Sequence, residues 1–134
     1  MLNRTLGMLF VMLALGGCAE PPYTNVDNEQ LKVLIDQGVA VYDIRRVDEW
    51  QQTGVIAGSQ KLTFVDANGK GSDKFLERFT TEVSKDKPVV LICRTGNRTD
   101  TLGRYLVEKL GYTQVYNVRD GITRWISAGN PVSR

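Results

Sequence analysis

The segment Leu91–Asp100, LICRTGNRTD, carries the side chains of this chain that are best suited to chemistry. Cys93 ends an apolar run, and Arg94, Gly96 and Arg98 follow it within a few positions. Glycine lets the backbone turn tightly, so that successive N–H groups can point inward and bind an anion. Arginines and the N-terminus of the next helix both favour the thiolate form of a nearby cysteine. The pattern predicts a nucleophilic thiolate that needs no histidine as its base, in a chain that has none.

The other cysteine, Cys18, lies in an N-terminal segment of a different kind. The apolar run Leu6–Gly17 follows Arg4 and is shorter than the about 20 residues that a bilayer-spanning helix needs. These are the features of a signal peptide. The stretch Leu15–Cys18, LGGC, resembles the lipobox of bacterial lipoproteins, in which the cysteine is lipidated and becomes the first mature residue. We therefore expect residues 1–17 to be a signal peptide and Cys18 the lipidation site; ordinary cleavage nearby or a buried helix is the alternative.

The residue after the lipobox bears on the destination of the protein. Ala19, rather than an aspartate, follows Cys18, which resembles the outer-membrane sorting pattern of bacteria with two membranes. We expect an exported, periplasmic lipoprotein anchored in the outer rather than the inner membrane, with residues 18–25 as a tether and residues 26–134 as the folded domain. Cys93 then has no disulfide partner within the chain. Such a cysteine is a reactive thiol, a partner in an intermolecular bond, or a small buried hydrophobe.

The elements that must position Cys93 alternate between strands and helices. Strands are expected at 39–44, 54–64 in part, 88–93 and 113–118, and helices after Asp27, at 47–53 and 72–81, up to Gly111 and around 122–126. This alternation predicts parallel strands with right-handed crossovers and helices on both faces. We expect one α/β domain with a parallel sheet of about five strands.

Two further polar residues are expected on the same edge of the sheet as the cysteine. Functional crevices of such sheets lie at the carboxyl ends of the strands, where Asp43 and Cys93 both fall. Arg45 follows closely and stands four residues before Glu49, so we expect these two to form an ion pair that supports the structure.

Composition excludes several classes of protein. With 42% hydrophobic and 24% charged residues among 134, the chain has the composition of one globular domain. Its 17 basic and 15 acidic residues are scattered, so a nucleic-acid partner is not expected.

Three stretches together resemble the rhodanese family of sulfurtransferases. The loop Cys93–Arg98, after the strand VVLI, resembles the six-residue active-site loop of that family. Residues 41–62, VYDIRRVDEWQQTGVIAGSQKL, resemble its first signature, although Val55 stands where histidine is usual. Residues 115–132, VYNVRDGITRWISAGNPV, resemble its closing signature, with Asp120 in place of a usual glycine. The resemblance covers nearly all of the expected mature chain and implies a rhodanese-like α/β fold.

The resemblance implies transfer of a sulfane sulfur. The Cys93 thiolate would attack the outer sulfur of a small anionic donor such as thiosulfate, sulfite would leave, and the persulfide would pass its sulfur to cyanide or a thiol. The residues expected to bind the donor are Arg94, Thr95, Gly96, Asn97 and Arg98, and Asp43 and Arg45 are secondary candidates for support. No metal and no organic cofactor is implied.

Other members of this family suggest alternative functions to sulfur transfer. Its phosphatase relatives have a longer loop, with arginine six positions after the cysteine, where this chain has Thr99. Ile92, rather than histidine, precedes the cysteine, which also favours sulfur transfer. The remaining alternatives are a persulfide carrier or redox-sensing binding module with little turnover, and a structural lipoprotein whose loop is vestigial.

Overall fold

A parallel sheet of five strands, in the order β1-β5-β4-β2-β3, forms the centre of the computed structural model, which describes residues 19–134. The strands are β1 (Thr24–Val26), β2 (Ala40–Asp43), β3 (Gln60–Lys61), β4 (Val89–Ile92) and β5 (Val115–Val118). The helices are α1 (Asn28–Asp36), α2 (Val47–Thr53), α3 (Asp73–Glu82), α4 (Asn97–Glu108) and α5 (Gly121–Ser127). The predicted α/β class with a five-stranded parallel sheet is confirmed.

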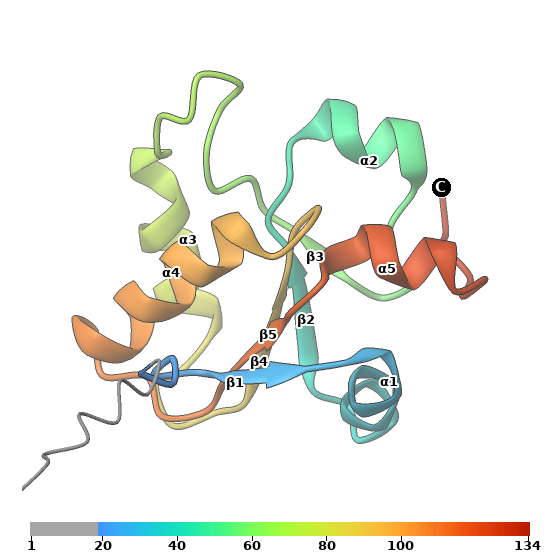
Figure 1. Cartoon of the computed structure of the whole chain (residues 1–134). Coiled ribbons are helices and arrows are strands. Elements are labelled where there is room, and N and C mark those ends of the chain that lie inside the picture. Colours follow the sequence, from blue (N-terminus) through green and yellow to red (C-terminus); the bar gives the residue numbers. More distant parts are fainter. Residues whose placement is uncertain (1–18) are drawn as a thin grey trace, which may run out of the picture.

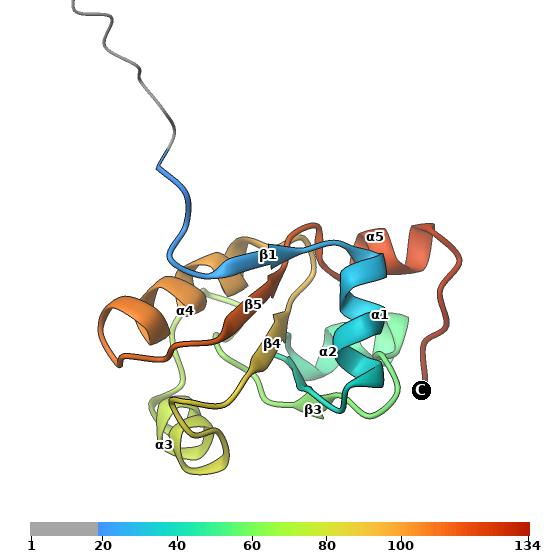
Figure 2. The ribbon, with the colours of Figure 1, turned by 90° about the horizontal axis from the view of Figure 1, so that it is seen from below.

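The sheet separates two clusters of buried apolar side chains. Figures 1 and 2 show the sheet and the helices that cover it from two sides. Helices α3 and α4 cover one face, and α1 and α5 cover the other. Strand β4 lies in the middle of the sheet, and its four residues are fully buried. Val89 and Leu91 belong to the cluster with α3 and α4, whereas Val90 and Ile92 belong to the cluster with α1 and α5. A strand covered on both faces explains the uninterrupted apolar run before Cys93.

Helix α1 follows Asp27, as expected, and begins with a capping box. The Gln30 backbone N–H donates to the Asp27 carboxylate at 2.9 Å, and the Gln30 side chain accepts from the Asp27 N–H at 2.9 Å. These bonds satisfy two N–H groups at the sheet edge.

The folded domain begins before residue 26, within the segment expected as a tether. Thr24 and Asn25 belong to β1, which pairs with β5 at the edge of the sheet. Tyr23 is buried against Gly103 of α4, and its hydroxyl donates to the Asp100 carboxylate. The expected signal peptide and Cys18 lie outside the described residues. Within residues 19–134, no helix is both long and apolar enough to cross a membrane.

Candidate active site

Cys93 lies directly after β4, at the carboxyl edge of the sheet, and only 1% of its surface is exposed. Its Sγ accepts a hydrogen bond from the Gly96 backbone N–H at 3.2 Å and lies 3.4 Å from the Thr99 Oγ1. Asp43 ends β2 and pairs in register with Ile92, so both predicted residues reach the same edge of the sheet. The cysteine is therefore a buried sulfur held by a loop N–H, at the place where parallel sheets carry their functional groups.

Gly96 makes the turn of this loop. Its φ of 98° lies in the left-handed region, and a Cβ at this position would lie 2.2 Å from the Arg119 carbonyl oxygen. Helix α4 begins at the next residue, Asn97, so the loop passes into the helix without a linker. The Asp100 N–H then donates to the Gly96 carbonyl at 3.1 Å. Both the conformation and the space at this position require glycine.

The start of α5, a later segment of the chain, supports the cysteine loop through hydrogen bonds. The Ile122 N–H donates to the Cys93 carbonyl at 2.9 Å, and the Thr123 N–H donates to the Arg94 carbonyl at 3.2 Å. Gly121 allows this approach, because a Cβ there would lie 2.2 Å from the Arg94 carbonyl oxygen. Sequence reasoning did not find this role; its one signal was the glycine in the closing signature. The unusual Asp120 is exposed at φ −100°, where glycine is not needed.

Arg98 lies beside Glu49 of α2. Its two terminal nitrogens donate to the two Glu49 oxygens at 2.6 and 2.8 Å. These bonds are the largest factor that lowers the pKa of Glu49, to about 2, and they also raise the pKa of Arg98. Glu49 is only 7% exposed, so the pair is largely shielded from solvent. The pair joins α2 to the first turn of α4, next to the cysteine loop.

The predicted Arg45–Glu49 ion pair is wrong. Arg45 pairs instead with Asp43, at 2.9 Å from Nε and 2.8 Å from a terminal nitrogen, and both side chains are buried. Arg45 also donates to the Thr53 hydroxyl and to the Gly54 carbonyl, each at 2.9 Å. Two residues apart, Asp43 and Arg45 close a turn after β2 and fix the end of α2. The structure thus places them as support for the edge of the sheet.

The other predicted loop residues differ in their exposure to solvent. Arg94, Thr95 and Asn97 are exposed, whereas Gly96 is buried. The structure therefore brings Cys93 and Gly96 together and leaves Arg94 at the surface of the loop. Thr99, by contrast, is completely buried against the sulfur and was not among the predicted site residues. The sequence feature that could have identified Thr99 is its position in the first turn of α4, which starts at Asn97 within the cysteine loop.

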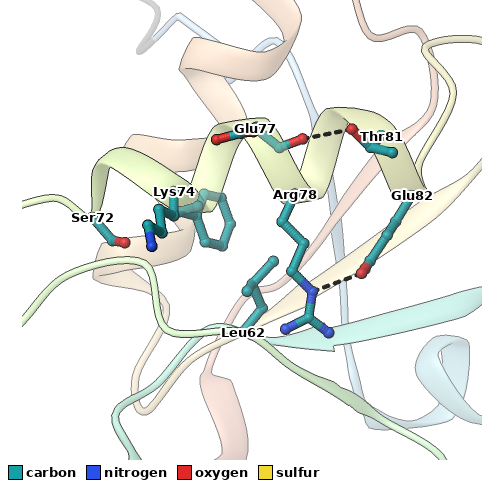
Figure 3. A pocket seen from close by; sticks show the side chains of 8 residues that line it. Leu62, Ser72, Lys74, Glu77, Arg78, Thr81 and Glu82 are labelled. Carbon is teal, nitrogen blue, oxygen red and sulfur yellow. Dashed lines mark hydrogen bonds and ion pairs between the residues drawn. The ribbon is translucent and has the colours of Figure 1, made fainter.

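A separate groove of about 550 Å³ lies between α3 and the segment after β3, as Figure 3 shows. Leu62 and Phe75 contribute apolar surface, and Arg78 on its wall pairs with Glu82 at 2.6 Å. The groove does not include Cys93 or a residue of its loop. Between residues 19 and 134, no three histidine, cysteine, aspartate or glutamate side chains gather as metal ligands would.

This combination of fold and loop defines a class of protein. The sequence model described as "Rhodanese-like domain" matches residues 27–128, and the chain belongs to this family. Among curated proteins, it is 31% identical over 100 residues to "Thiosulfate sulfurtransferase GlpE" of Pseudoalteromonas translucida, covering 75% of this chain and 85% of that protein. The protein of the same name from Pseudomonas fluorescens strain Pf-5 is 31% identical over 116 residues, covering 81% of this chain and 96% of its own.

Solved structures show the same fold. A rhodanese-related protein from Thermoplasma volcanium superposes with a TM-score of 0.63 at 26% identity, covering 83% of this chain and 98% of that one. The polysulfide-sulfur transferase homodimer from Wolinella succinogenes gives a TM-score of 0.62 at 22% identity, covering 82% and 77% of the two chains. The second likeness concerns the fold alone.

Proposed function

We propose that this protein is a sulfurtransferase that moves a sulfane sulfur from thiosulfate, or a similar small anionic donor, to cyanide or a thiol. The observation that carries the proposal is the Cys93 Sγ, held at 3.2 Å by the Gly96 N–H in a glycine-turned loop before α4. The loop N–H and the start of the helix both favour negative charge on the sulfur. The names of the relatives, thiosulfate sulfurtransferases, support the same reaction.

The reaction balances without a cofactor. In the loading step, the Cys93 thiolate forms a bond to the outer sulfur of thiosulfate, the sulfur–sulfur bond of the donor breaks, and its electron pair leaves with sulfite. In the discharge step, cyanide attacks the outer sulfur of the persulfide, thiocyanate leaves, and the thiolate returns. Each step conserves charge and transfers no proton, so a site without histidine suits it.

The donor would meet arginines at the mouth of the loop. Arg94 is exposed there, and Arg98 uses one N–H of each terminal nitrogen for Glu49. A guanidinium has five N–H groups, so Arg98 keeps donors for the sulfonate oxygens of thiosulfate.

A persulfide carrier with little turnover is the second candidate. Cys93 is only 1% exposed, but the outer sulfur of its persulfide would extend further outward, toward a partner protein. A carrier would load once and then discharge to a partner protein with a suitably placed thiol.

One experiment distinguishes these functions. The full-length protein, purified in detergent, is incubated with thiosulfate and its intact mass is measured before and after cyanide is added. We expect a gain of one sulfur on Cys93, its loss with release of thiocyanate, and many repeated cycles. Loading without repeated cycles would favour the carrier, and a folded, reduced protein that gains no sulfur would contradict both functions.

We also propose that Cys18 anchors the domain to a membrane through covalently attached lipid. The signal-peptide features before it and the short distance to the domain support this reading. In the bacterial host, the wild-type protein should fractionate with membranes and Cys18→Ser should not be processed to the lipidated form. A wild-type protein whose mass includes no lipid would overturn the proposal.

A further inference from the structure

Thr99 is a buried polar residue that lies against the reactive sulfur and has no part in the function proposed so far. It is the third residue of α4 and is 0% exposed. Its Oγ1 lies 3.4 Å from the Cys93 Sγ and donates to the Gly96 carbonyl oxygen at 3.1 Å. A threonine hydroxyl has one hydrogen, so it can donate to only one of these two neighbours at a time.

This inference rests on the proposed function. During that reaction, the Cys93 Sγ is at one stage a stronger acceptor than the Gly96 carbonyl oxygen and at another stage a weaker one. Before loading, the negative charge is on the Cys93 Sγ, next to the hydroxyl. In the persulfide, the charge moves to the outer sulfur, and the inner Sγ becomes a neutral, weak acceptor. Hydrogen bonds to a charged acceptor are stronger than those to a neutral one. The hydroxyl should therefore turn to the sulfur when the sulfur is charged and to the carbonyl when it is not.

We propose that Thr99 is a catalytic residue that stabilises the Cys93 sulfur as a leaving group in the discharge step. There, cyanide forms a bond to the outer sulfur, the sulfur–sulfur bond breaks, and its electron pair passes to Sγ. The Thr99 hydroxyl turns from the Gly96 carbonyl to Sγ as this charge develops. In the loading step, the same bond favours the thiolate but weakens it as a nucleophile, so the two effects offset each other.

The Thr99 hydroxyl can be removed without leaving either of its two neighbours without a hydrogen bond. The Gly96 carbonyl also accepts from the Asp100 N–H at 3.1 Å, and the Cys93 Sγ keeps the Gly96 N–H at 3.2 Å. Thr99→Val has the same shape as threonine and replaces only the hydroxyl by a methyl group. It therefore isolates the hydrogen bond to sulfur.

The test compares the two half-reactions in full-length protein variants. We expect Thr99→Val to discharge its persulfide to cyanide about tenfold more slowly, with a smaller change in loading by thiosulfate. Thr99→Ser keeps the hydroxyl and should match the wild type. Thr101→Val, on the exposed side of the same helix, is the matched control and should also match it. Unchanged discharge in Thr99→Val, or equally slow discharge in Thr99→Ser, would overturn the proposal.

A second readout does not depend on sulfur transfer. Cys93 is first converted to a mixed disulfide with 2-mercaptoethanol. A reducing thiol then attacks the outer sulfur, the sulfur–sulfur bond breaks, and its electron pair passes to the Cys93 Sγ, as in the discharge step. Thr99→Val should be reduced severalfold more slowly than the wild type and Thr99→Ser. Equal rates of reduction overturn the role of Thr99 even if the protein transfers sulfur, whereas failure of the wild type to load sulfur from thiosulfate counts against the proposed function. If Thr99→Val does not fold, Thr99→Ala replaces it in both assays.

Discussion

Cys93→Ser is expected to lower the rate of thiocyanate formation from thiosulfate and cyanide by more than about a thousandfold. Serine lacks the polarisable, readily ionised sulfur, and its hydroxyl is not deprotonated near neutral pH in a site without a histidine base. The intact mass should then show no added sulfur after exposure to thiosulfate.

The fold should survive this change, which makes the result interpretable. The serine hydroxyl is smaller than the thiol and can use the same two neighbours, the Gly96 N–H and the Thr99 hydroxyl. Circular dichroism and a thermal melt of Cys93→Ser should therefore resemble those of the wild type. Activity within tenfold of the wild type, in a folded variant, would mean that the cysteine is not the nucleophile.

Much of the site could be predicted because its features are local in the sequence. The apolar run of β4 requires cover on both faces, and glycine after the cysteine requires a tight turn. The order of strands and helices then places Asp43 and Cys93 at one edge of the sheet. Each of these steps depends on the spacing of apolar residues or on the backbone freedom of glycine. Both can be recognised in short segments of the sequence.

The ion pairs were harder to predict because they depend on distant parts of the chain. Glu49 has Arg45 and Arg46 near it in sequence, but its strongest partner is Arg98, 49 positions away. Arg45 turns back to Asp43 because that carboxylate is buried at the end of β2, where an unpaired charge would be costly. Sequence spacing predicts only partners that are near Glu49 in the chain. The position of α2 beside the start of α4 determines that Arg98 is its partner.

Support of the loop by α5 leads to the second prediction of large effect. Gly121→Ala places a Cβ 2.2 Å from the Arg94 carbonyl oxygen, at a φ of 66°. The loop or the helix must move by about 1 Å, and a displacement of that size at a reacting group costs about a hundredfold in rate. We therefore expect Gly121→Ala to load sulfur about a hundredfold more slowly and to melt at a lower temperature than the wild type.

Gly129→Ala separates crowding from backbone strain. Gly129 follows the other end of α5 at a φ of 81°, but a Cβ there would meet nothing within 4 Å. This variant should lose about 1 kcal/mol of stability from the left-handed conformation and keep the full rate of sulfur loading. Thermal melts and loading rates of the two variants are measured side by side. If both variants load sulfur at the same rate, the contact between Gly121 and the cysteine loop does not position the sulfur. Slow loading in Gly121→Ala alone would identify the start of α5 as the support of the active site.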